Sequence, residues 1–101
     1  MSASRSFCLS RAAEQDLIDI YVFGATAFGL SQADAYFASL ETACQFLADN
    51  PEAARLRTEI TPPVRCHPHG AHMIIYSDHL EDVVVILRAR HAREDWEDTP
   101  V

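Results

Sequence analysis

The spacing of apolar and polar residues predicts two long helices in the first half of the chain. Between residues 11 and 28 apolar side chains recur every three or four positions, with Glu14, Asp16 and Asp19 between them. Residues 31–50 repeat this spacing, and a period of about 3.6 residues is typical of a helix that buries one face. The short connection between the two stretches favours an antiparallel pair of helices.

Residues with capping chemistry mark the ends of both predicted helices. The hydroxyl of Ser10 can accept a hydrogen bond from an amide of the first turn, and Gly29 is suited to ending the first helix. We expect Ser31 to begin the second helix in the same way. Asn50 and Pro51 should stop it, because a residue before proline disfavours the helical conformation.

Four further stretches have the composition of strands. Residues 5–9 form a short candidate before the first helix. Residues 64–69 form another, and Pro68 within it lacks an amide donor, which suits a sheet edge or a bulge. Residues 71–77 and 83–89 are rich in β-branched and aromatic side chains and flank a polar turn. This pattern predicts a β-hairpin.

The strand pattern also indicates the architecture. Residues 83–87 are apolar at every position, so we expect this strand inside the sheet with both faces covered. Residues 51–63 should form a loop, with room for one helical turn at 52–56. The prediction is an α+β fold in a single domain, residues 1–101, with the order β-α-α-β-β-β. A helical hairpin then packs on one face of a small antiparallel sheet.

Charge and composition narrow the function classes. The 101 residues carry a formal net charge of −7, which argues against a protein that coats nucleic acid. No apolar run reaches the roughly 20 residues that span a bilayer, and the first residues lack the apolar core of a signal peptide. The three cysteines are odd in number and scattered, which favours reduced thiols. We therefore expect a cytoplasmic protein without direct nucleic-acid or membrane binding.

One cluster has metal-binding chemistry. Cys66, His67 and His69, with His72 nearby, could supply thiolate and imidazole ligands to zinc. The fourth ligand is undefined, however, and no C-x-x-C or H-E-x-x-H pattern is present. Surface histidines on an edge strand are the favoured interpretation, and we expect neither a metal nor another cofactor.

The end of the last predicted strand carries a basic cluster. Arg88, Arg90, His91 and Arg93 could bind phosphate or support acid–base chemistry on RNA. Acidic residues follow at once, so a neutralised and solvated tail is an equally good interpretation. Trp96 lies among these acids, and either packing against the core or anchoring a partner would account for it.

Motifs along most of the chain resemble the ParE toxins of the RelE/ParE superfamily. Residues 9–20, LSRAAEQDLIDI, resemble the strand end and helix start of that family. The resemblance runs from residue 7 to residue 96. It is carried further by Gln32-Ala33, Tyr36, Leu40-Glu41, residues 47–51 (LADNP), Val64-Arg65, Gly70, Tyr76, Val85-Ile86-Leu87, His91-Ala92-Arg93 and Asp95-Trp96.

The resemblance implies the toxin of a type II toxin–antitoxin system. ParE toxins inhibit DNA gyrase without chemistry of their own, so the implied protein is not an enzyme and has no catalytic residues. A ParD-like antitoxin of the ribbon-helix-helix type would neutralise it by wrapping a segment over the toxin. The two proteins would form a heteromeric complex.

Two sets of residues are expected to make these contacts. The end of the last strand and the tail are expected to face gyrase: Arg88, Arg90, His91, Arg93, Asp95 and Trp96. The grooves of the helical hairpin and an exposed sheet edge are expected to hold the antitoxin, with candidates Tyr21, Phe28, Phe37 and Tyr76. Salt bridges to the antitoxin are expected from Arg55, Arg57, Arg65 or Arg88.

Two alternatives remain open. RelE-like relatives cleave mRNA on the ribosome, and here only His91, with Arg65, Arg88 and Arg93, could supply the base, the acid and the charge stabilisation. The net charge of −7 makes the approach to a ribosome unfavourable. The other alternative is a homologue without toxicity that serves as an antitoxin partner or co-repressor.

Overall fold

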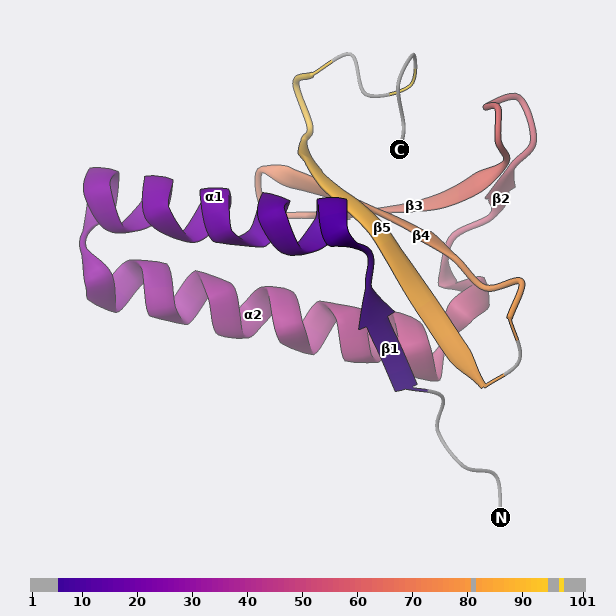
Figure 1. Ribbon diagram of the computed structural model, residues 1–101, viewed down its shortest axis with the longest axis horizontal. Helices are drawn as coiled ribbons and strands as arrows, with labels where there is room; N and C mark the ends of the chain where they lie inside the picture. Colours follow the sequence, from indigo (N-terminus) through magenta and orange to yellow (C-terminus); the bar gives the residue numbers. More distant parts are fainter. Residues whose placement is uncertain (1–5, 81, 95–96, 98–101) are drawn as a thin grey trace.

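The computed structural model describes residues 6–80, 82–94 and 97. It has the predicted α+β fold, in which an N-terminal strand and two helices precede the remaining strands (Figure 1). The helical hairpin covers one face of a single sheet. The elements are β1 Ser6–Leu9, α1 Arg11–Phe28, α2 Leu30–Asp49, a short 3-10 helix Pro51–Ala53, β2 Leu56–Arg57, β3 Val64–His69, β4 His72–Ser77 and β5 Val83–His91.

The five strands of the sheet lie in the order β1-β5-β4-β3-β2. The pairs β5–β4 and β4–β3 are antiparallel, as expected, and β3–β2 is antiparallel as well. β1, however, runs parallel to β5, with Ser6 opposite Val83 and Leu9 opposite Ile86, so the sheet is mixed. β5 is therefore an interior strand, as its continuous apolar block predicted.

A short strand lies in the segment that was predicted to be a loop. β2 has two residues, and they pair with Val64 and Arg65 at the start of β3. Beyond these two pairs, the outer edge of β3 has no neighbouring strand among the described residues. Pro68 lies on this open stretch, in agreement with its missing amide donor.

The observed helix caps agree with the predicted ones at three of the four ends of α1 and α2. The hydroxyl of Ser10 accepts a hydrogen bond from the Ala13 amide at 3.0 Å, and α1 and α2 end at Gly29 and Asn50. The prediction for Ser31 is wrong, because α2 already begins at Leu30. Gly29, with φ of 98°, is the only residue between the helices, which places Ser31 inside the first turn.

The core lies between the hairpin and the sheet. Leu40, Leu47, Ile74, Tyr76 and Ile86 are all at most 1% exposed there. Each fully buried side chain of this size contributes about 1.5–3 kcal/mol of transfer free energy. A smaller cluster on the other face of the sheet consists of Ile60, Val64 and Ile75, with Cys66, Met73 and Leu87 packed against it.

The hairpin extends beyond the sheet at the end where its helices join (Figure 1). α1 has 18 residues and α2 has 20, whereas β3 and β4 have six each. At about 1.5 Å per helical residue and 3.3 Å per strand residue, the helices are roughly 27 and 30 Å long and these strands about 20 Å. β5 has nine residues, about 30 Å, but it runs at an angle to the helices, so the joined ends of α1 and α2 lie outside the cover of the sheet (Figure 1).

Candidate functional site

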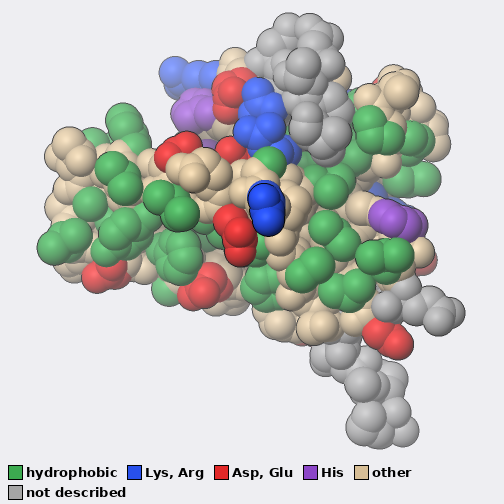
Figure 2. Space-filling model, viewed as in Figure 1, with side chains coloured by type: hydrophobic (Ala, Val, Ile, Leu, Met, Phe, Trp, Pro, Cys, Tyr) green, Lys and Arg blue, Asp and Glu red, His purple; other side chains and the backbone are tan. Residues whose placement is uncertain are grey.

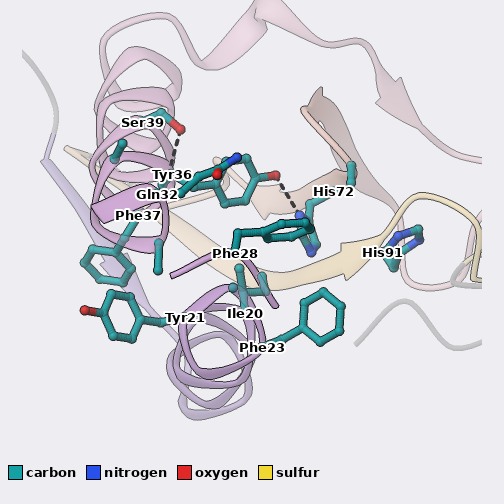
Figure 3. Close-up of a pocket in the computed structure, with 14 residues that line it drawn as sticks. Ile20, Tyr21, Phe23, Phe28, Gln32, Tyr36, Phe37, Ser39, His72 and His91 are labelled. Carbon is teal, nitrogen blue, oxygen red and sulfur yellow. Dashed lines mark hydrogen bonds between the residues drawn. The ribbon is translucent and has the colours of Figure 1, made fainter. Parts of the chain in front are cut away.

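A wide cleft lies at the overhang of the hairpin. This hairpin cleft has a volume of about 600 Å³ and opens between the two helices and the ends of β4 and β5. Figure 3 shows residues from both helices directed into the same space as two histidines of the sheet. The lining comprises Ile20, Tyr21, Phe23, Gly24, Phe28, Gln32, Ala33, Ala35, Tyr36, Phe37, Ser39, Ala71, His72 and His91.

Aromatic side chains form the outer wall of the cleft. Phe23 is 67% exposed and Phe28 is 62% exposed, and their rings meet edge to face with centroids 6.3 Å apart. The helices are close together here, since a Cβ at Gly24 would lie 3.5 Å from the Cβ of Ala33, an ordinary contact distance. The cleft is thus an open apolar surface held by closely packed helices.

The inner rim of the cleft is polar. The hydroxyl of Tyr36 lies 2.7 Å from Nδ1 of His72 and 3.2 Å from the carbonyl oxygen of His69, to which it donates (Figure 3). Ser39 lies 2.9 Å from Nε2 of His69. The turn at Gly70, with φ of +55°, leaves room for Tyr36, because a Cβ there would lie 2.6 Å from the tyrosine oxygen.

Three histidines cross the sheet in register at this rim. His69 pairs with His72 across β3 and β4, and His72 pairs with His91 across β4 and β5. The rings of His72 and His91 have centroids 5.6 Å apart. Burial lowers the pKa of His72, and the neighbouring His91 and His69 lower it further.

A second hollow continues from the cleft along β5. This charged groove has a volume of about 370 Å³ and contains the ion pair between Arg88 and Asp16, with N–O distances of 2.6 and 2.9 Å. Asp16 also accepts the amide of Ala89 at 3.0 Å. The other residues that line the charged groove are Asp19, Ile20, Phe23, His72, Arg90, His91 and Glu94.

A third hollow lies on the outward face of the hairpin. This outer groove, of about 300 Å³, is lined by Leu17, Ile18, Tyr21, Val22 and Phe37. Ile18 and Val22 are 55% and 56% exposed. Figure 2 shows hydrophobic side chains exposed over the hairpin, with acidic side chains along the margins.

The structure brings together three of the four aromatic residues predicted to contact an antitoxin. Tyr21, Phe28 and Phe37 all line the hairpin cleft. Tyr21 donates a hydrogen bond to Asp34 at 2.5 Å, which raises the pKa of the phenol. Tyr76 is instead a core residue with no exposed surface, and its hydroxyl donates to the carbonyl of Pro51 at 2.9 Å. Tyr76 is therefore removed from the candidate contacts.

The arginines predicted to contact an antitoxin already have acidic partners. Arg65 donates to Asp78 at 3.1 Å and to the carbonyl of Ala54 at 2.6 Å, and Arg88 is paired with Asp16. Arg55 and Arg57 both contact Glu59, and Arg57 also contacts Glu97 at 2.7 Å. With a side chain 71% exposed, Arg55 is the most accessible of the four.

The predicted gyrase-facing residues are only partly exposed. Arg90 donates to Glu94 at 2.9 Å, and Glu94 also accepts the amide of His91 at 2.7 Å. Neutralisation of the basic cluster by the following acids was one of two equally good interpretations, and the Arg90–Glu94 pair agrees with it for Arg90. The exposed members are His91 and Arg93. Asp95 and Trp96 lie outside the described residues.

Ile20, Phe23 and Tyr36 line the cleft, although the sequence did not assign them to a partner surface. Ile20 and Tyr36 have helical spacing typical of core positions, so periodicity alone cannot distinguish them from buried residues.

The described residues contain no group of three histidine, cysteine or acidic side chains arranged to hold a metal ion. His67 packs against Phe46, with ring centroids 5.9 Å apart, while His69 turns toward α2. In the described part of the chain, neither helix combines the length and hydropathy needed to cross a bilayer.

Comparisons with known proteins agree on one family. Residues 8–96 match the family model described as the ParE toxin of the type II toxin–antitoxin system parDE. The chain is 32% identical over 92 residues to toxin ParE1 of Mycobacterium tuberculosis, in strains CDC 1551 / Oshkosh and ATCC 25618 / H37Rv, which covers 91% of this chain and 94% of each relative. A structure of the chromosomal ParDE system from P. aeruginosa shares the fold, with a TM-score of 0.72 at 20% identity over 89% of this chain and 98% of that one.

Proposed function

The chain belongs to the ParE toxin family of type II toxin–antitoxin systems, and from this premise we propose that it inhibits DNA gyrase until a ParD-like antitoxin covers its helical hairpin. Its established class is the toxin component of such a system. The proposal adds the target, the antitoxin partner and the surfaces that each would use.

The observation that carries the antitoxin site is the open hairpin cleft. Two phenylalanines on its wall are more than half exposed, and burying each would contribute about 1.5–3 kcal/mol of transfer free energy. Apolar patches of this kind are typical of protein-binding surfaces. A segment that places apolar side chains in the cleft would bind as an amphipathic helix or extended chain does in a groove.

The outer groove extends the same surface around the hairpin. Tyr21 and Phe37 line both hollows and meet edge to face, with ring centroids 6.0 Å apart. Residues 11–49 contain one arginine and six acidic residues, which gives the hairpin a formal charge of −5. Charge complementarity therefore favours a basic antitoxin segment with apolar anchors.

For the gyrase contact we propose the exposed end of β5 and the tail that follows it. His91 and Arg93 are the accessible described members of this set, and Asp95 and Trp96 come next along the chain. Arg88 and Arg90 serve to hold β5 against α1 and the turn after it, through their acidic partners. Inhibition by contact requires no catalytic group in the toxin.

A purified gyrase assay tests the target. We expect the protein to reduce ATP-dependent supercoiling and to accumulate linear DNA, while mRNA in a translating extract remains intact. Trp96→Ala should weaken inhibition and leave antitoxin binding unchanged. Phe23→Ser should have the opposite pattern, since it alters the cleft and not the tail. Normal supercoiling with the wild-type protein would reject the gyrase target.

RNA cleavage is the second candidate, and one observation favours it. The rings of His72 and His91 lie 5.6 Å apart with the Tyr36 hydroxyl against His72, an arrangement able to move protons. Cleaved message with normal supercoiling would establish this activity and assign His91 a catalytic role. No effect in either assay, with antitoxin binding retained, would identify a homologue without toxicity.

A further inference from the structure

The hairpin cleft and the charged groove form one continuous surface. Ile20, Phe23, His72 and His91 line both hollows. A segment that fills the apolar cleft and extends past Phe23 therefore enters a region with charged walls. The side chains of that region determine which residue the segment can carry there.

Most charges in the groove already have partners. Asp16 is bound to Arg88 through two hydrogen bonds and to the amide of Ala89. Arg90 and Glu94 are paired at 2.9 Å. These two ion pairs leave little net charge for a partner to neutralise.

Asp19 differs from the other charges in the groove. It lies one turn after Asp16 on α1, and its side chain is exposed. The contact of its carboxylate, within the described part of the chain, is the amide of Gln15 at 2.9 Å. Gln15 is neutral, so this hydrogen bond does not compensate the negative charge of Asp19.

We propose that the charged groove is a specificity site for one cationic side chain of the antitoxin, and that Asp19 is its receptor. This rests on the proposed docking of an antitoxin segment in the hairpin cleft. The segment places apolar anchors against Phe23 and Phe28 and a lysine or arginine beside Asp19. Asp16, Arg88, Arg90 and Glu94 flank that cation, and their internal pairing fixes the walls of the groove.

The test measures the affinity of the full-length cognate ParD-like antitoxin by calorimetry at pH 8, where histidine side chains are neutral. Asp19→Asn should weaken binding roughly tenfold, since an interfacial charge pair would be lost. Glu41→Gln is the matched control, because Glu41 is an exposed acid of α2 that lines none of the three hollows. It should change the affinity by less than about twofold. Raising the salt concentration should weaken the wild-type complex more than the Asp19→Asn complex.

The variant Phe23→Ser separates this inference from the proposed function. If Phe23→Ser weakens binding while Asp19→Asn and Glu41→Gln have equal effects, the receptor role of Asp19 is rejected and the cleft remains the docking site. If none of the three variants alters the affinity, the antitoxin binds elsewhere and both proposals fail. Asp19 and Phe23 are exposed, so neither substitution should impair folding.

Discussion

Ser10 joins the start of the first helix to the last described strand. Its hydroxyl accepts the Ala13 amide at 3.0 Å and donates to the carbonyl oxygen of Leu87 at 2.7 Å. Its own amide donates to the carbonyl of Ile86 at 2.9 Å. One short side chain therefore satisfies a helix end and a strand carbonyl together, and the sequence predicted only the first of these roles.

Replacing Ser10 should lower the free energy of unfolding. Ser10→Ala removes a helix cap and leaves the Leu87 carbonyl without its hydroxyl donor, so we expect a loss of about 1–3 kcal/mol. Ser31→Ala is the matched control, because Ser31 is exposed inside α2 and caps nothing; a change within about 0.5 kcal/mol is expected. Urea denaturation of both variants measures the difference, and equal losses would contradict the assigned role of Ser10.

The three cysteines should differ in reactivity. Burial raises the pKa of Cys44 to about 11, with Glu41 adding to the effect, and burial likewise raises the pKa of Cys66 to about 11. At pH 8 such a thiol is ionised in about one molecule in a thousand. Cys8 is exposed on β1.

Iodoacetamide at pH 8 should therefore label Cys8 first, as read by peptide mass spectrometry. In denaturing urea all three cysteines should react at similar rates, because the burial that raises two of the pKa values is lost. Equal labelling of Cys8 and Cys66 in the folded protein would show that Cys66 is more accessible than its packing against the smaller cluster implies.

The partners of single residues were the least predictable feature of the chain. Arg88 and Asp16 are 72 positions apart and form an ion pair at 2.6 Å, yet no local pattern connects them. The sequence pattern around Tyr76 is compatible with an exposed position and with a core position. Alternation along a strand does not reveal which face of the sheet is covered. Both outcomes depend on tertiary packing.

The helical hairpin is the element that sequence reasoning described best. Its apolar period, its glycine connection and its Asn-Pro stop are local signals, and the structure follows them. The cap of α2 was placed two residues late, at Ser31 instead of Gly29, because a serine is a better cap by chemistry than the glycine that the tight reversal requires. The cleft was not predicted, because it depends on how the helices cross the sheet, and the length of the helices does not give that angle.

Hydrogen exchange should divide the hairpin into two parts. Amides in residues 22–32 lie in the overhang, away from the sheet, so we expect them to exchange faster than amides near Leu40 and Leu47. Antitoxin binding should slow the exchange of residues 22–32 most. Amides of β4 serve as an internal control, with unchanged slow exchange. Uniform exchange along both helices would contradict a weakly held overhang.

Across the whole molecule, the positions of most strands could be predicted from the sequence, but the pairing of the strands could be predicted only in part. Sequential strands β3, β4 and β5 pair as adjacent hairpin partners, which is the common arrangement. The parallel pairing of β1 with β5 spans almost the entire chain, and a four-residue strand carries too little pattern to specify it. β2, with two residues, has no pattern of its own.

The same parallel pairing constrains when the toxin can fold. β1 is synthesised near the beginning of the chain and its partner near the end, since the Ser10–Leu87 hydrogen bond spans 77 positions. Contacts this distant form late and slow folding. A growing chain on the ribosome therefore exposes its hairpin before it can complete its core. If the antitoxin docks on the hairpin as proposed, an antitoxin that is already present would meet its site before the finished toxin exists.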